Sequence, residues 1–145
     1  MRTKRWPLAE SVILVLLCAS LSHYPARADI CIGETLKVSH VIGHVIALWR
    51  GGEEPIPNAS IELKEFRNDE WQTKFTATSD DKGTFRIENV PSGRYEIYVA
   101  SQHFHTFGTR LNLKALKSTP TREIVVTLGL GIHDCGTARV RKLNR

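Results

Sequence analysis

Histidines are the residues of this 145-residue chain whose type and spacing come closest to a site for chemistry. His103 and His105 are separated by one residue, so an extended backbone places both imidazoles on the same side. Such a pair can hold zinc or copper if the fold supplies one or two further ligands. His40, His44 and His133 are the candidates for a third ligand. The alternative is that the pair is ordinary polar surface in a loop.

Aromatic side chains form a second candidate site, because exposed flat rings can stack on sugars. Trp49 and Trp71 fall beside expected turns, and Tyr98 alternates out of phase with the apolar residues of its segment. Phe107 is a fourth candidate for such a glycan platform. The alternative is that these rings pack at sheet edges and against cross-strand neighbours.

Sequence motifs of common enzymes are missing from the chain. It has no nucleophile elbow, no His-Glu-x-x-His and no phosphate-binding glycine loop. Its Ser and Asp residues are concentrated in turns, where hydrogen bonds to the backbone account for them. We therefore expect a protein that catalyses no reaction and needs no cofactor.

The first 28 residues have the three parts of a secretory signal. Basic residues near the start precede an apolar run over residues 11–21, and Ala26-Arg27-Ala28 is a small-x-small cleavage site. The run is too short to span a bilayer comfortably, so cleavage would leave no transmembrane segment. We expect cleavage after Ala28 and a secreted or periplasmic protein.

The signal segment also explains most of the basic charge. It holds four of the twenty basic residues and one of the fifteen acidic residues, so its removal lowers the net charge from +5 to +2. The charge of the precursor is therefore no argument for nucleic-acid binding, and no nucleic-acid partner is expected. The basic residues near the C-terminus are expected to form a solvated tail.

Two cysteines remain after cleavage, Cys31 and Cys135. A disulfide between them is the first expectation in an oxidising compartment. Closing so long a loop would stabilise the fold by about 4 kcal/mol on the chain-entropy model. Unpaired thiols and an intermolecular bridge are the alternatives.

Short alternation of apolar and polar residues predicts an all-β domain, a seven-stranded Greek-key β-sandwich. The expected strands cover residues 37–48, 60–66, 72–78, 84–88, 94–100, 109–113 and 123–128, and 137–142 is an eighth candidate. Gly83 and Gly93 are both expected to supply the positive φ of a turn. Because residues two apart share a face, the expected core includes Ile61, Leu63, Phe85, Ile87, Tyr95, Ile97, Val99, Ile124, Val126 and Leu128.

Three turn motifs punctuate these strands: Pro-Ile-Pro-Asn-Ala-Ser-Ile at 55–61, Ser-Asp-Asp-Lys-Gly-Thr-Phe at 79–85 and Val-Pro-Ser-Gly-Arg-Tyr at 90–95. Their order, after an opening Gly43-His44-Val45, resembles the carboxypeptidase regulatory-like domains, which are transthyretin-like or Ig-like sandwiches. His103 departs from the family pattern, in which Gly commonly stands there, so that loop is expected to have its own conformation. The Tyr-Arg-Gly-Ser end of the hydroxyisourate hydrolases, which share this fold, is absent.

The resemblance covers residues 41–128. With the signal peptide (1–28), the expected division adds an N-terminal extension (29–40) and a C-terminal extension with a basic tail (129–145) to this regulatory-like domain. Asn58-Ala59-Ser60 is a glycosylation sequon whose use depends on the organism.

We expect an exported binding or structural module that contacts a protein or glycan at the cell surface or in the periplasm. The alternatives are a zinc- or copper-binding protein that uses the His-x-His pair and a carbohydrate-binding module with exposed aromatics. The identity of the partner and the oligomeric state are left open.

Overall fold

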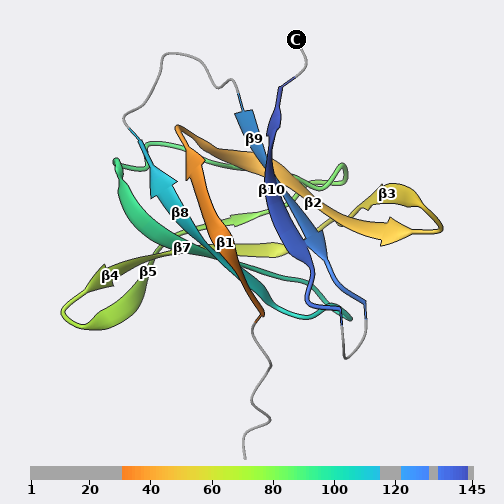
Figure 1. Cartoon of the computed structure of the whole chain (residues 1–145), viewed down its shortest axis with the longest axis horizontal. Helices are drawn as coiled ribbons and strands as arrows, with labels where there is room; N and C mark the ends of the chain where they lie inside the picture. The colour runs from red at the N-terminus through yellow and green to blue at the C-terminus, as the bar shows by residue number, and fades with distance from the viewer. Residues whose placement is uncertain (1–30, 115–121, 131–133, 144–145) are drawn as a thin grey trace, which may run out of the picture.

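The computed structural model of the chain describes residues 31–114, 122–130 and 134–143, which form two β-sheets (Figure 1). The strands are β1 (Cys31–Val38), β2 (Val41–Trp49), β3 (Gly52–Pro55), β4 (Ser60–Arg67), β5 (Glu70–Thr78), β6 (Thr84–Ile87), β7 (Gly93–Ala100), β8 (Phe107–Leu113), β9 (Arg122–Leu128) and β10 (Thr137–Lys142). In these residues there is no helix long and apolar enough to cross a membrane.

The two sheets pack face to face as a β-sandwich. Sheet A has the strand order β1-β8-β7-β4-β5, and sheet B has the order β10-β9-β2-β3, with β6 also paired to β2. The pairs β1–β8 and β2–β9 are parallel, and the other pairs are antiparallel. Neighbours in a sheet are thus often distant in sequence, as in a Greek-key sandwich.

The core lies between the sheets and is built from the inward residues of each strand. All ten core residues predicted from alternation are buried, with exposures of 8% or less. Strand β9 is buried on both faces, because Val125 on its outer side is as fully buried as Ile124 and Val126 on its inner side, and Glu123 and Thr127 beside Val125 are also buried.

The count of seven strands is wrong, because the described residues alone form ten. The predicted strand 37–48 is divided by a bend at Ser39 and His40, which sends β1 into sheet A and β2 into sheet B. Alternation continues on both sides of this bend, so periodicity alone could not detect the change of sheet. Strand β3 was not predicted because Gly-Glu-Glu-Pro has little strand propensity. It forms by pairing with β2.

A disulfide joins Cys31, the first residue of β1, to Cys135, which lies just before β10. Because β1 is the edge of sheet A and β10 the edge of sheet B, this bond closes one side of the sandwich. The segments on either side of residues 41–128 therefore contribute edge strands to the domain. The predicted signal peptide, residues 1–28, and His133 lie outside the described residues.

Two predicted turns lie where the chain passes between the sheets, before and after β6. Gly83 has φ of 71°, as predicted, and its turn is held by the Asp80 carboxylate, which accepts hydrogen bonds from the backbone N–H groups of Lys82 and Thr84. These hydrogen bonds, the Thr84 one foremost, lower the pKa of Asp80. The expectation for Gly93 is wrong, because it does not have a positive φ and it starts β7.

Candidate functional site

The outer face of sheet A carries a row of polar side chains around a buried carboxylate. Glu96 on β7 is in register with Lys64 on β4 and with Arg110 on β8, so the three side chains share this face. We call them the Glu96 row. Glu96 is only 5% exposed although it faces away from the core. Its Oε1 accepts a hydrogen bond from Arg110 Nε at 3.3 Å.

Tyr98 completes the environment of this carboxylate. Its hydroxyl donates a hydrogen bond of 2.7 Å to Glu96 Oε2, and Lys64 Nζ lies 4.5 Å from the centre of its ring. Burial and the nearby carboxylate raise the pKa of Tyr98 to about 12. The carboxylate thereby fixes the position of an arginine and a tyrosine on the face of the sheet.

A second row of side chains crosses the same face of the sheet, with basic and polar side chains on β1, β8 and β7 and aromatic side chains on β4 and β5. Arg94 on β7 is in register with Asn112 on β8, and Asn112 with Lys37 on β1. Glu65 on β4 pairs with Tyr95, the residue after Arg94, so Phe66, the next residue of β4, lies beside Arg94. Phe66 in turn pairs with Trp71 on β5. The Arg94 row consists of Trp71, Phe66, Arg94, Asn112 and Lys37.

Phe66 and Trp71 are held together by a tight turn between β4 and β5. Asn68 and Asp69 both have positive φ, at 50° and 63°, as a two-residue type I′ hairpin turn requires. The turn places the two rings as a cross-strand pair with their centroids 5.2 Å apart and their planes tilted by 57°. Phe66 is 53% exposed and Trp71 39% exposed, so this aromatic pair is open to solvent.

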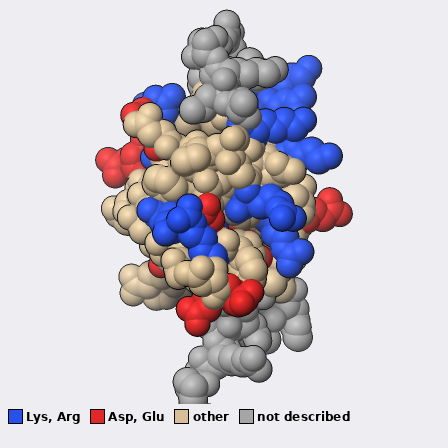
Figure 2. All heavy atoms as spheres, turned by 90° about the vertical axis from the view of Figure 1, so that its left-hand side faces the viewer, with Lys and Arg blue, Asp and Glu red and all other residues tan. Residues whose placement is uncertain are grey.

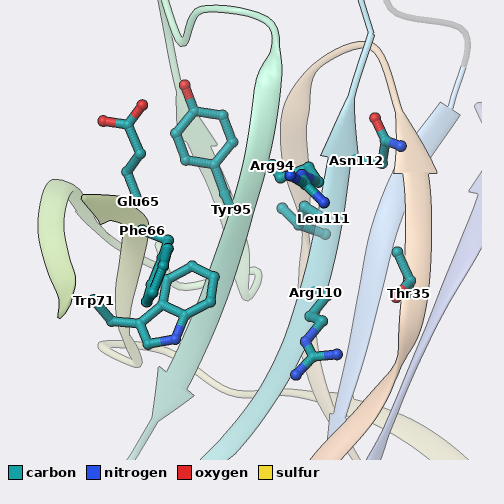
Figure 3. A pocket seen from close by; sticks show the side chains of 9 residues that line it. All are labelled: Thr35, Glu65, Phe66, Trp71, Arg94, Tyr95, Arg110, Leu111 and Asn112. Atoms are coloured by element: carbon teal, nitrogen blue, oxygen red, sulfur yellow. The ribbon is translucent and has the colours of Figure 1, made fainter. Parts of the chain in front are cut away.

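Four residues of the Arg94 row (Trp71, Phe66, Arg94 and Asn112) and Arg110 of the Glu96 row line a hollow of about 690 Å³ on the outer face of sheet A, which we call the groove. Figure 3 shows the two rings side by side, with Arg94, Arg110 and Asn112 on the strands beyond β4. The residues that line the groove are Thr35, Glu65, Phe66, Trp71, Arg94, Tyr95, Arg110, Leu111 and Asn112.

The groove is more basic than acidic. Arg94 in its lining, and Lys37 beside it in the Arg94 row, have no ion-pair partner within the part of the chain that the structure describes, whereas Glu65 in the lining is paired with Arg67 at 2.7 Å. Figure 2, which views the molecule from the side toward which β4 and β5 extend in Figure 1, shows several groups of Lys and Arg side chains, two of which flank a small acidic area near the centre, and further Asp and Glu side chains below them. The arrangement can bind a ligand with an apolar face and negative charge.

The structure divides the aromatic residues proposed from the sequence. Trp71 and Tyr98 share the outer face of sheet A, but Lys64 covers one face of the Tyr98 ring. Trp49 ends β2 in sheet B and is 50% exposed, away from the groove. The proposal for Phe107 is wrong, because its side chain belongs to the core and is 2% exposed.

The histidines are placed in different parts of the fold. His103 and His105 lie in the loop between β7 and β8, where His103 is exposed and has φ of 71°, so this loop does have an unusual conformation. His44 lies on β2, where its Nε2 is 3.2 Å from Glu123 Oε2. Among residues 31–114, 122–130 and 134–143, no three His, Cys, Asp or Glu side chains converge as a metal site would require. Asn58 of the sequon is exposed in a turn.

Sequence reasoning missed Phe66, Glu96, Arg94 and Arg110. One signal was available, because Phe66 and Trp71 stand symmetrically around Asn68-Asp69, a pair of residues that favours a two-residue hairpin turn. The other three could not be grouped without the register of β7 against β8.

Comparison with known proteins agrees with this fold. The carboxypeptidase regulatory-like domain family matches residues 41–128, the range over which the turn motifs indicated a resemblance. No curated protein matches the chain. Among solved structures, the chain is similar to the crystal structure of an (S)-allantoin synthase, with 12% sequence identity and a TM-score of 0.42. The match covers 74% of this chain and 46% of that protein. Since the family match takes in more than half of the sequence, the chain belongs to the carboxypeptidase regulatory-like domain family.

Proposed function

We propose that this protein is an exported, non-catalytic binding module and that the groove on sheet A is its ligand-binding surface. The observation that carries the proposal is the combination of an exposed aromatic pair, Phe66 and Trp71, with two arginines in one hollow. Tryptophan and arginine are the side chains that most often dominate binding energy at recognition surfaces. A hollow of about 690 Å³ is also within the usual size range of ligand sites.

Three edge strands, β5, β3 and β10, favour recognition through a sheet face over recognition by strand addition. At the β5 edge, the register against β4 shifts by one residue, and Lys74 is the extra residue. A lysine and a bulge are two features that block edge-to-edge pairing. Strand β3 presents Glu53, Glu54 and Pro55, and β10 is rich in Arg and Lys. Each of these edges is thus a poor template for a further strand.

Export is supported by the disulfide and by the leader-like sequence of residues 1–28. A Cys31–Cys135 bond persists in oxidising compartments, such as the periplasm or the cell exterior. The partner would then be a molecule met outside the cytoplasm, either a protein or a glycan.

Tryptophan fluorescence provides the test. After cleavage at Ala28 the chain has two tryptophans, Trp49 and Trp71, so a Trp49→Phe variant reports on the groove alone. The variant would be titrated with a panel of extracellular glycans and peptides. We expect at least one ligand to change the Trp71 emission and to lose its affinity in Trp71→Ala, while Trp49→Ala binds normally. Binding that depends on Trp49 and not on Trp71, or no binding across the panel, would refute the assignment of the groove.

A further inference from the structure

We infer that the groove binds an acidic glycan, a sugar chain that carries carboxylate groups. The inference rests on the proposed function and deepens it by naming the class of ligand. Three features of the groove point to this chemistry: its charge, the arrangement of its rings and the source of its hydrogen-bond donors.

The charge of the face favours an anionic ligand. The Glu96 row and the Arg94 row together hold four basic side chains. Glu96 is buried and hydrogen-bonded to Arg110 and Tyr98, and Glu62 on the same face is paired with Lys64, so Arg94 and Lys37 keep their charge unpaired among the described residues. A ligand that enters from solvent therefore meets the arginines before it meets the carboxylate. The guanidinium of Arg94 is exposed and can make the paired hydrogen bonds that a carboxylate accepts.

The rings favour a ligand with flat apolar patches. Phe66 and Trp71 are tilted by 57° to one another, so they do not form one flat platform. Each ring can instead contact a separate patch of C–H groups, as the successive units of a sugar chain present. The rings continue the row of Arg94, so a bound chain would place successive units on Trp71 and Phe66 and a charged group on the arginine.

The hydrogen-bond donors of the groove come from side chains, which suits a glycan better than a peptide. The strands under the groove already pair with one another through their backbone groups. An extended peptide on this face would leave its own backbone N–H and C=O groups without backbone partners, at a cost in binding. Hydroxyl and carboxylate groups of a sugar can bond to Arg94, Arg110, Asn112 and Thr35. From β5 to β1 the row crosses five strands, about 19 Å, enough for several sugar units.

Calorimetric titration with oligogalacturonate, a chain of carboxylate-bearing sugars, is the direct test. The comparison ligands are a neutral oligosaccharide of equal length, a sulfated oligosaccharide and a poly-glutamate peptide. We expect oligogalacturonate to bind best and to weaken as salt is raised. Arg94→Ala should weaken binding about tenfold or more, and Arg94→Lys should weaken it less, because the charge is kept but the paired hydrogen bonds are lost.

Trp49 and Arg50 supply a matched control, since they are an exposed tryptophan and arginine at the end of β2, away from the groove. Trp49→Ala and Arg50→Ala should each leave the affinity for oligogalacturonate within about twofold of the parent, whereas Trp71→Ala should weaken it about tenfold. Arg94 is exposed, so its variants are expected to stay folded, and the thermal midpoint of each variant checks this.

The outcomes separate this inference from the function on which it rests. If the neutral sugar bound equally well, or the sulfated sugar or the peptide bound better, the ligand would not be a carboxylate-bearing glycan. The groove would still be the binding site if Trp71→Ala weakened the binding of that ligand. Failure of oligogalacturonate to bind at millimolar concentration would also overturn the inference. If Arg50→Ala weakened the binding of oligogalacturonate as much as Arg94→Ala did, the groove would not be the binding site, and both the inference and the proposed function would be refuted.

Discussion

The Tyr98 hydroxyl donates a 2.7 Å hydrogen bond to the carboxylate of Glu96, a side chain that is buried although it lies on the outer face of its sheet. Arg110 donates a second hydrogen bond to the other oxygen of this carboxylate. A charged group that is almost removed from water requires such partners. The two bonds therefore have a structural role as well as a role in shaping the groove.

Tyr98→Phe should reduce the free energy of unfolding by about 1.5–3 kcal/mol, because a hydrogen bond to a charged acceptor is lost while Glu96 stays buried. Tyr95→Phe is the matched control. The Tyr95 hydroxyl donates at 3.0 Å to a neutral acceptor, the Pro91 carbonyl, so its loss should cost only about 1 kcal/mol. Urea unfolding of both variants measures the difference, and an equal cost would contradict the role given to Glu96.

The raised pKa of Tyr98 predicts a loss of stability at alkaline pH. In the folded chain its pKa is about 12, against 10 for an unperturbed tyrosine. Between these values the unfolded chain has lost the phenolic proton and the folded chain retains it, so stability is fully present below pH 10 and falls as pH rises toward 12. Unfolding measured from pH 9 to 11.5 should show this fall, and Tyr98→Phe should reduce it. A pH dependence that is the same with and without Tyr98 would exclude this cause.

Sequence reasoning correctly predicted burial, because the alternation within one strand is enough to show which side chains face the core. Alternation placed Tyr95, Ile97 and Val99 in the core, and the structure buries all three. It failed where pairing partners decide, as in β3, and where the chain changes sheets at Ser39 and His40 without a break in its apolar pattern. Gly93 was misassigned because Pro-Ser-Gly also fits a turn without positive φ.

The disulfide predicts a large loss of stability on its removal. Cys31 and Cys135 are separated by 104 positions, so the bond restricts most of the unfolded chain. Cys31→Ser with Cys135→Ser should lower the free energy of unfolding by about 2–5 kcal/mol. Intact mass should show a gain of two hydrogens on reduction of the parent protein. A parent protein whose mass does not change, or a double variant of unchanged stability, would contradict the bond.

Gly83→Ala should destabilise the fold by about 2–5 kcal/mol. Its φ of 71° disfavours any side chain, and an added Cβ would press on the Val45 carbonyl oxygen and lie 3.2 Å from the backbone nitrogen of Ile56. Gly51→Ala is the control, because Gly51 also has a positive φ, 84°, but open space around it. That variant should lose only about 1–2 kcal/mol. Similar losses in thermal unfolding would show that contact with β2 is unimportant.

Ser79→Ala should cost about 2–4 kcal/mol, because two buried backbone groups lose their partner. The Ser79 hydroxyl donates to the Ile56 carbonyl at 2.8 Å and accepts from the Ala59 N–H at 2.9 Å, so it holds the turn before β4. Ser60→Ala, at an exposed position beside this turn, should change the free energy of unfolding by less than about 0.5 kcal/mol. Denaturant titration compares the two, and a Ser79→Ala variant as stable as Ser60→Ala would contradict the prediction.

The candidate site was harder to predict than the core for a physical reason. Trp71 could be proposed from its place beside a turn. It forms a site only together with Phe66 across the hairpin and Arg94 two strands away. Outer-face residues have no apolar period that marks them, so only the pairing of β4, β7 and β8 brings them together. The same lack of pattern hid Glu96, since a glutamate on an outer face reads as solvated.

The bond between Cys31 and Cys135 also determines how the domain would respond to mechanical tension. A pull applied through the chain before Cys31 and after Lys142 would peel β10 away from β9 and then pass directly through the two sulfur atoms. The strands from β2 to β9 lie within the covalent loop and would carry none of that load. The groove, which is built on β4, β5, β7 and β8 together with the edge of β1, would then hold its ligand under tension.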